Sequence, residues 1–257
     1  MPTPQVASPQ VSLILPTYNE AHNIVPLIQE LKRHLNGVSH EILLMDDNSP
    51  DRTAQVAEAA FADDSTVQVH IRVRDRGLAK AVREGVERSR GAYVLVMDSD
   101  FNHDPAIVGR LVELSQHADM VIGSRFCDGG GMASRWRYHC SRLYSNWFVR
   151  PLLGMGVRDN LCGYYLIRRD RLMRLPYDEI FHGYGDYFFR LLWHARAVGC
   201  SMIETPVFYR QRPSGRSKSN LPVLLFSYTW TVLDLWLHAG QPRWPAPGSD
   251  KPDTPHG

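Results

Sequence analysis

The first half of the chain alternates short apolar runs with segments of helical periodicity, and this alternation constrains the fold more than any other feature. Five runs have the length of strands: Val11–Leu15, Glu41–Met45, Val67–Val73, Ala92–Met97 and Asp119–Gly123. Near-continuous apolar strands are typical of a sheet covered on both faces, and parallel strands need helical crossovers between them. The sequence therefore predicts an α/β fold, with a doubly wound, mainly parallel sheet and helices on both faces.

Helix-forming signals stand between these runs. Apolar residues recur at helical spacing over residues 24–35, after the first run. In the segment NSPDRT, Ser49 is expected to cap a helix that has Pro50 at its first position. Asp104 and Pro105 repeat this arrangement after the fourth run. With 257 residues, 44% of them hydrophobic, the chain is long enough for one large domain of this kind.

The fourth run leads into LVMDSDFNHDP, in which Asp98 and Asp100 stand one residue apart. Two like charges about 6–7 Å apart on an extended backbone destabilise each other unless a positive group lies between them. Carboxylate oxygens are hard ligands that suit Mg²⁺ or Mn²⁺. The segment therefore predicts a divalent metal site at the end of a strand.

The first two runs also end in polar residues. LPTYNE offers Tyr18 to stack on a base and Glu20 to accept a hydrogen bond, and MDDNSPD offers Asp46 and Asp47 to a base or ribose. Each is an ordinary loop residue when taken alone. In open α/β sheets, however, ligands bind beyond the carboxyl ends of the strands, so three acidic strand ends together indicate a nucleotide site. A dinucleotide-binding oxidoreductase is disfavoured, because it would carry G-x-G-x-x-G where this chain has PTYNE.

The formal net charge of +2 conceals two basic clusters, over residues 125–174 and 210–218. Such clusters usually form a solvated face, but they also bind phosphate or an anionic membrane surface. Nucleic acid is disfavoured as a partner, because no recognised motif accompanies the charge. The cysteines are Cys127, Cys140, Cys162 and Cys200. Their wide spacing fits neither a zinc site nor a disulfide scaffold, so free thiols in the cytosol are expected.

The ends of the chain differ from its centre. Residues 1–10 lack the basic and apolar regions of a signal peptide and are expected to be flexible. The segment Leu221–Gly240 approaches the length of a membrane span but contains Pro222, several hydroxyl residues and Asp234. It is interpreted as an interfacial, amphipathic helix, with a core helix packed on the sheet as the alternative. Residues 241–257 are rich in proline and polar residues, which predicts disorder.

Five segments in this order, SLILPTYNEAHNI, EILLMDDNSPDRT, VLVMDSDFNHDP, VIGSRF and GRSK, resemble those of family 2 glycosyltransferases. These enzymes have the GT-A fold, which is Rossmann-like. Within the family the chain is most similar to the branch of polyprenyl-phosphate (dolichyl-phosphate) mannosyltransferases, and the similarity extends from Val11 to Asn220. Together with the ends of the chain, this similarity predicts four segments: a flexible N-terminus (1–10), a single GT-A glycosyltransferase domain (11–220), the amphipathic helix (221–240) and the disordered tail (241–257).

The resemblance implies an enzyme that uses a nucleotide-diphospho-sugar and a divalent metal, Mg²⁺ or Mn²⁺, and inverts the anomeric centre. GDP-mannose follows from the nearest branch, although a UDP-sugar would use the same strand-end chemistry. The matching positions assign the nucleotide-sugar to Pro16, Tyr18, Glu20, Asp46, Asp47 and Asp98, and the metal to Asp98, Asp100 and Asn102. A metal that bridges the two phosphates would act as a Lewis acid while the nucleoside diphosphate leaves.

On the acceptor side, the resemblance assigns a phosphate to Arg125 in the segment GSRF. Arg137 or Arg142, together with Arg212 and Lys218, are further candidates. A polyprenyl phosphate at the cytoplasmic face of the membrane is the implied acceptor, with the protein bound peripherally. A phosphate monoester has a second pKa near 6 and needs no general base at neutral pH.

One segment departs from this branch. The relatives carry a G-Y-x-F-Q-x-E type pattern, whereas this chain has HGYGDYFFRLLWHA, with Asp186 after a glycine. Asp186 is interpreted as a general base, a donor-positioning residue, or an acid that opens a helix. The segment RDNLCGYYLIRR also matches the family, and Asp159 and Gly163 are expected to shape the sugar pocket or to form a β-turn.

Two other functions remain open at this point. The first is transfer to a hydroxyl acceptor on a glycan, lipid or secondary metabolite, with Asp186 as the base. The second is a non-catalytic module that binds nucleotide-sugar or membrane. The paired carboxylates Asp98 and Asp100 argue against the second alternative.

Overall fold

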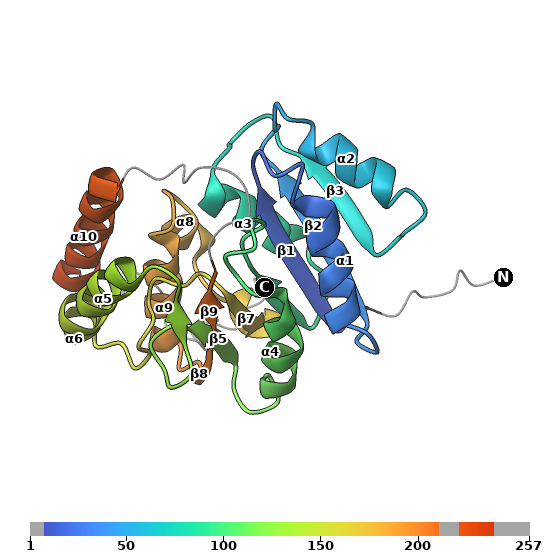
Figure 1. Ribbon diagram of the computed structural model, residues 1–257. Helices are drawn as coiled ribbons and strands as arrows, with labels where there is room; N and C mark the ends of the chain where they lie inside the picture. Colours follow the sequence, from blue (N-terminus) through green and yellow to red (C-terminus); the bar gives the residue numbers. More distant parts are fainter. Residues whose placement is uncertain (1–7, 211–220, 239–257) are drawn as a thin grey trace, which may run out of the picture.

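The structure is a computed structural model that describes residues 8–210 and 221–238. A seven-stranded sheet forms its centre, in the order β3-β2-β1-β4-β7-β5-β8 (Figure 1). The strands of this sheet are β1 (Val11–Thr17), β2 (His40–Asp46), β3 (Val67–Ile71), β4 (Tyr93–Val96), β5 (Met120–Ser124), β7 (Tyr165–Arg168) and β8 (Met202–Pro206). A small parallel pair, β6 (Gly131–Met132) and β9 (Phe208–Tyr209), lies beside it.

Helices cover both faces of the sheet. The helices of the described chain are α1 (Ile24–His34), α2 (Thr53–Ala60), α3 (Leu78–Arg88), α4 (Val108–Leu114), α5 (Arg135–Leu143), α6 (Arg150–Leu153), α7 (Arg169–Leu172), α8 (Tyr177–Ile180), α9 (Tyr187–Ala197) and α10 (Leu221–Leu237). A 3₁₀ turn, η1 (Pro105–Ile107), precedes α4, and a π-helical turn, η2 (Tyr144–Val149), joins α5 to α6.

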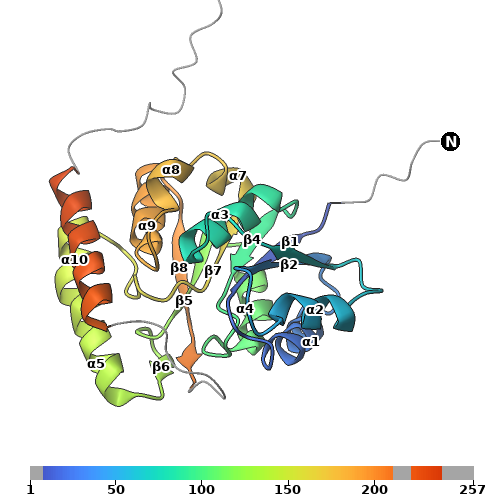
Figure 2. The ribbon, with the colours of Figure 1, turned by 90° about the horizontal axis from the view of Figure 1, so that it is seen from above.

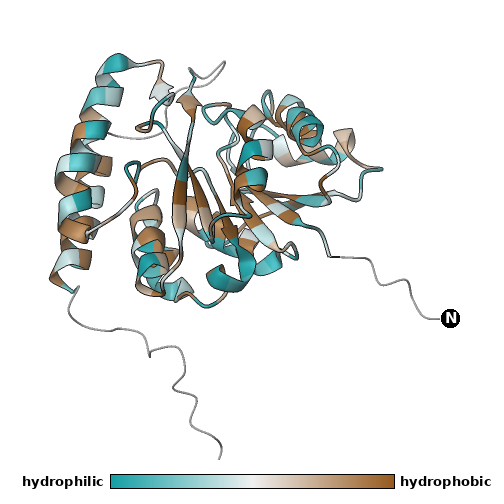
Figure 3. Cartoon of the chain, turned by 90° about the horizontal axis from the view of Figure 1, so that it is seen from below, coloured by the Kyte–Doolittle hydropathy of each residue, from teal (hydrophilic) through white to brown (hydrophobic). Residues whose placement is uncertain are grey.

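The strands are apolar on both sides because each face of the sheet has its own core. Leu13 and Leu15 of β1 pack in the cluster of α1, α2 and α4, whereas Ile14 packs in the cluster of α3 and α9. Hydrophobic residues accordingly dominate the strands at the centre of the molecule (Figure 3). The predicted doubly wound α/β fold and all five predicted strands are therefore confirmed, with ends that differ by one or two residues.

Two features of the sheet were not predicted. Strand β7 lies between β4 and β5 and is antiparallel to both, while every other neighbouring pair of this sheet is parallel. The second feature is the edge strand β8, which pairs with β5. The pocket or turn expected at Asp159 and Gly163 precedes β7, and the apolar run of four residues at β7 itself is too short to distinguish a strand by pattern.

One predicted helix start is wrong and the other is confirmed. Helix α2 begins at Thr53, after Arg52 in the left-handed conformation (φ 64°), and Ser49 instead donates its hydroxyl hydrogen bond to Asp46. A capping Ser49 would accept a hydrogen bond from a helix amide, but its oxygen accepts from the Asn19 amide instead (2.9 Å), so no cap forms at Pro50. The second start is as predicted, because Asp104 accepts a hydrogen bond from the Ala106 amide (3.1 Å) and Pro105 opens η1.

Helix α10 lies at one end of the molecule, next to α5 and α6 in both views (Figures 1 and 2). It contacts α6 and α9 rather than lying on the sheet. Among its described side chains only Thr231, Val232 and Leu235 are buried. In its described part, α10 thus packs mainly on other helices, and Val232 and Leu235 join the core cluster that contains α9. No helix in the described part of the chain combines the length and apolarity needed to cross a bilayer.

Candidate active site

The predicted ligand site lies at the edge where the parallel strands β1, β2 and β4 end. The sheet order places these strand ends side by side, with β1 between the other two. Two hydrogen bonds join the loops that follow: the Asp47 amide donates to Thr17 O (3.0 Å), and the Ser99 hydroxyl donates to Pro16 O (3.1 Å). The residues predicted to bind nucleotide and metal are therefore brought to one edge of the sheet.

Asp98 and Asp100 follow β4 in a tight turn. Phe101 has a left-handed backbone (φ 60°), which is strained for an aromatic residue and is typical of functional sites. Asp100 is buried and accepts hydrogen bonds from the Asn102 amide (3.0 Å) and from Nδ2 of Asn102 (3.1 Å). The Asp98 side chain, in contrast, is 43% exposed.

The donor set of this turn fits a divalent cation that takes other ligands from its substrate. The described residues contain no group of three or more His, Cys, Asp or Glu side chains that would enclose an ion. Mg²⁺ is usually held by one or two carboxylates plus substrate phosphates rather than by an all-protein cage. The side-chain nitrogen of Asn102 donates a hydrogen bond to Asp100, so the predicted metal ligand of Asn102 is its side-chain oxygen.

His103 supports this turn and was not singled out in the sequence. It is completely buried, stacks on Tyr164 (4.7 Å between ring centres) and accepts a hydrogen bond from the Asp98 amide at Nδ1 (2.9 Å). Burial lowers the pKa of His103 to about 4, so the ring is neutral at neutral pH. Nε2 then carries the proton and faces Tyr209 Oη (2.5 Å) and Cys162 O (3.2 Å). The only sequence signal for His103 is its place directly after the DSDFN segment.

Arg125 forms a buried ion pair with Asp159. Its Nε and Nη2 each lie 2.7 Å from the Asp159 carboxylate, which is itself fully buried. Burial alone would lower the pKa of Arg125, but Asp159 outweighs this effect and raises it above its ordinary value. The guanidinium lies over the Tyr209 ring (4.6 Å) and the Phe126 ring (5.0 Å). The sequence had assigned these two charges to different pockets, and the structure brings them together.

A ladder of rings leads from Arg125 to helix α5. Phe126 contacts Tyr138 edge to face (5.6 Å), and Tyr138 lies beneath the Arg142 guanidinium (5.9 Å). Arg137 and Arg142 are exposed on α5. The ring contacts connect Arg142 to Arg125 although the two residues are far apart in the sequence. Among the described residues, Nη1 of Arg125 makes no hydrogen bond. Arg212 and Lys218, the other predicted acceptor residues, lie outside the described part of the chain.

The residues predicted to bind the base and ribose make protein contacts of their own. Asp46 accepts hydrogen bonds from the amide (2.8 Å) and hydroxyl (2.5 Å) of Ser49. Asp47 pairs with buried Arg72, which the sequence did not single out, and accepts from the Gly77 amide (2.6 Å). Both acids therefore hold the loops after β2 and β3 in place.

Tyr18 and Glu20 lie in the loop that follows β1. Tyr18 is 37% exposed, and the Arg76 guanidinium lies 5.3 Å from its ring centre. Glu20 accepts a hydrogen bond from the Asn23 side chain (2.6 Å). The ring of Tyr18 is therefore accessible for stacking, and Arg76 adds a positive charge beside it.

Asp186 is buried, and both of its carboxylate oxygens are engaged. Oδ1 accepts from the Tyr184 amide (2.8 Å), and Oδ2 accepts from Arg190 (2.8 Å) and from the Thr231 hydroxyl (3.1 Å). A general base must reach the proton that it removes. This geometry favours a positioning role for Asp186 over a role as base.

Solved structures of two glycosyl-3-phosphoglycerate synthases share this fold. Mannosyl-3-phosphoglycerate synthase from Rubrobacter xylanophilus superimposes with a TM-score of 0.63 at 18% identity, over 93% of this chain and 78% of that one. Glucosyl-3-phosphoglycerate synthase from Mycobacterium tuberculosis, crystallised with Mn²⁺, UDP and glucosyl-3-phosphoglycerate, gives 0.60 at 21% identity, over 90% and 79%. The architecture is thus that of GT-A glycosyltransferases.

Residues 12–190 match the sequence profile described as Glycosyl transferase family 2, and the chain belongs to that family. It is 36% identical to the polyprenol monophosphomannose synthase of Mycolicibacterium smegmatis over 83% of both chains. It is 34% identical to the undecaprenyl-phosphate mannosyltransferase of Micrococcus luteus, over 81% of this chain and 87% of that one. The dolichol-phosphate mannosyltransferase of Pyrococcus furiosus is 29% identical, over 81% of this chain but 59% of its own length.

Proposed function

We propose that this glycosyltransferase moves a mannosyl group from GDP-mannose to a polyprenyl phosphate, with inversion and with Mg²⁺ or Mn²⁺ bound at Asp98 and Asp100. The observation that carries the proposal is the turn after β4, which places Asp98 and Asp100 at the strand-end edge, with Arg125 anchored by Asp159 directly after β5. The names of the relatives supply the acceptor class and the sugar.

In this reaction an oxygen of the acceptor phosphate forms a bond to the anomeric carbon while the bond from that carbon to the diphosphate breaks. The metal, when bound, neutralises charge that develops on the leaving diphosphate. Asp98 and Asp100 hold and orient it, and His103 fixes the backbone of Asp98. The dianionic acceptor needs no proton acceptor, which agrees with the engaged carboxylate of Asp186.

The test combines ligand binding with acceptor choice. GDP-mannose with Mn²⁺, at about 100 times its dissociation constant, should raise the melting temperature by roughly 5–10 °C. UDP-glucose and UDP-N-acetylglucosamine should raise it less. Transfer should occur to undecaprenyl phosphate and not to undecaprenol, which presents a hydroxyl. Transfer to the alcohol at a comparable rate would contradict the phosphate assignment, and a larger shift with a UDP-sugar would contradict the donor.

We also propose peripheral contact with the cytoplasmic face of the membrane through α5, η2 and α10. These neighbouring segments expose large side chains: Trp136 (76%), Trp147 (79%), Phe226 (74%) and Trp230 (66%). Aromatic rings favour the boundary between headgroups and acyl chains. The exposed Arg135, Arg137 and Arg142 on α5 complement anionic lipid.

Vesicle sedimentation checks this contact. The wild-type chain should bind vesicles that contain anionic lipid, and binding should weaken as salt rises. The double substitution Trp136→Ser and Trp147→Ser should reduce binding at least tenfold, since it removes two interfacial aromatic groups. Val73→Ser removes an equally exposed apolar side chain (68%) from the end of the sheet near β3 and should change little. Equal losses in both variants would contradict the proposed face.

A further inference from the structure

A buried polar network joins helix α10 to the loop that precedes α9. The Thr231 hydroxyl of α10 donates to Asp186 Oδ2 (3.1 Å) and accepts from Arg190 Nη1 (3.2 Å). Arg190 Nη1 also pairs with Asp186 Oδ2 (2.8 Å). All three side chains are at most 7% exposed. Thr231 of α10 therefore forms a triangle of polar contacts with Asp186 and Arg190, which lie outside α10.

Asp186 and Arg190 together fix the shape of loop 182–186. Asp186 Oδ1 accepts from the Tyr184 amide (2.8 Å), and Arg190 donates to the carbonyl oxygens of Ile180 (3.1 Å) and His182. Gly183 has a left-handed backbone (φ 75°), and an added Cβ there would lie 2.8 Å from the Asp186 carboxylate. The loop is therefore closed tightly around these two charged groups, and a displaced Asp186 would release it.

Tyr228 of α10 brings the same loop into electrostatic range of the candidate active site. Its ring contacts Phe189 edge to face (5.2 Å), and its hydroxyl lies 2.1 Å from where a Cβ on Gly185 would be. Burial raises the pKa of Tyr228, the charges of Asp186 and Asp98 raise it further, and Arg125 opposes them. Tyr228 therefore lies within electrostatic reach of Asp98 and of Arg125.

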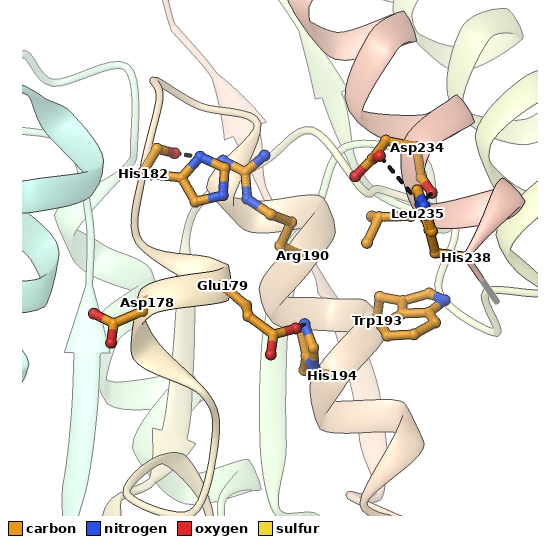
Figure 4. Close-up of a pocket in the computed structure, with 9 residues that line it drawn as sticks. All are labelled: Asp178, Glu179, His182, Arg190, Trp193, His194, Asp234, Leu235 and His238. Atoms are coloured by element: carbon orange, nitrogen blue, oxygen red, sulfur yellow. Dashed lines mark hydrogen bonds and ion pairs between the residues drawn. The ribbon is translucent and has the colours of Figure 1, made fainter. Parts of the chain in front are cut away.

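The contact between α10 and the body depends on few groups. A cavity of about 250 Å³ lies among α8, α9 and α10, with His182, Arg190, Asp234 and His238 in its lining (Figure 4). Thr231, Val232 and Leu235 are the buried members of the helix's described side chains. The position of α10 therefore relies on polar contacts such as that of Thr231 more than a helix in a continuous apolar core would.

We propose that Thr231 and Arg190 are positioning residues through which the seating of α10 sets the conformation of loop 182–186 at the active site. The expected effect on transfer kinetics rests on the proposed function, whereas the expected effect on the conformation of loop 182–186 does not. No contact of either side chain with substrate is implied. Both act through Asp186.

The test compares two isosteric substitutions on α10. Thr231→Val removes the hydroxyl that bridges Arg190 and Asp186, whereas Thr229→Val removes a hydroxyl that bonds Tyr144 (3.2 Å) and does not reach the loop. Amide hydrogen exchange over residues 182–186 should become about tenfold faster in Thr231→Val, and Thr231→Ser should restore it. In Thr229→Val, exchange over this loop should match the wild type.

Transfer kinetics give a second readout. In Thr231→Val, kcat/KM for transfer should fall roughly tenfold through kcat, while Mn²⁺-dependent binding of GDP-mannose stays within about twofold. Unchanged exchange and kinetics in Thr231→Val would overturn the inference, as would equal effects in both Val variants. If the wild type fails to transfer to undecaprenyl phosphate, the proposed function is wrong, and the exchange experiment still decides the coupling between α10 and the loop.

Discussion

Asp100→Asn should abolish sugar transfer while leaving the protein folded. The substitution keeps an oxygen that can accept the Asn102 amide hydrogen bond, so the turn after β4 should persist. It removes one of the two charges proposed to hold the cation. Metal stabilisation of a leaving group is worth several kcal/mol, so the rate should fall by about 10²–10³-fold or more. Initial rates at saturating Mn²⁺ measure this effect.

Binding and stability measurements separate this loss from misfolding. In Asp100→Asn, the Mn²⁺-dependent thermal shift with GDP-mannose should disappear. The metal-free melting temperature should stay equal or rise, because the repulsion between Asp98 and Asp100 is relieved. Asp128→Asn makes the same charge change at an exposed site and serves as the control. Activity of Asp100→Asn within a few fold of the wild type would refute the metal site.

Arg125→Met should cause the largest loss of stability among single changes at the site. It leaves the fully buried Asp159 carboxylate without its bidentate partner. Breaking a buried ion pair by removal of one partner typically costs about 3–5 kcal/mol. Chemical denaturation should detect this loss, and Arg88→Met, which breaks an exposed pair with Glu84, should cost at most about 1 kcal/mol.

A double variant separates folding from acceptor binding. Arg125→Met with Asp159→Asn removes both charges and keeps an acceptor for one of the two backbone amides that Asp159 holds, those of residues 125 and 161, so part of the stability should return. If Nη1 of Arg125 contacts the acceptor phosphate, the double variant should bind GDP-mannose normally but show a strongly raised KM for undecaprenyl phosphate. An unchanged acceptor KM would limit Arg125 to its ion pair with Asp159.

The sequence by itself determined the α/β fold of this protein and the part of the candidate site formed by the strand-end carboxylates. Strands β1, β2, β4 and β5 are apolar because both of their faces are buried, and a continuous apolar run is a local signal, whereas the edge strand β3 is only half-buried. Asp98 and Asp100 are read from positions one residue apart at the end of one strand. The Asp104 cap is also local, because its acceptor and donor are two residues apart. Each of these features depends on neighbours in the chain.

Only the tertiary structure decided how the distant charges pair. Arg125 finds Asp159 34 residues away, and Arg190 finds Thr231 41 residues away. Such partners are chosen by the folded arrangement, because a buried charge must meet whichever opposite or polar group the packing brings within reach. In the same way, the Ser49 oxygen accepts from the Asn19 amide, 30 residues away, in place of its predicted cap. The folded arrangement also engages Asp186 with Arg190 and Thr231, where the sequence had left a general base open.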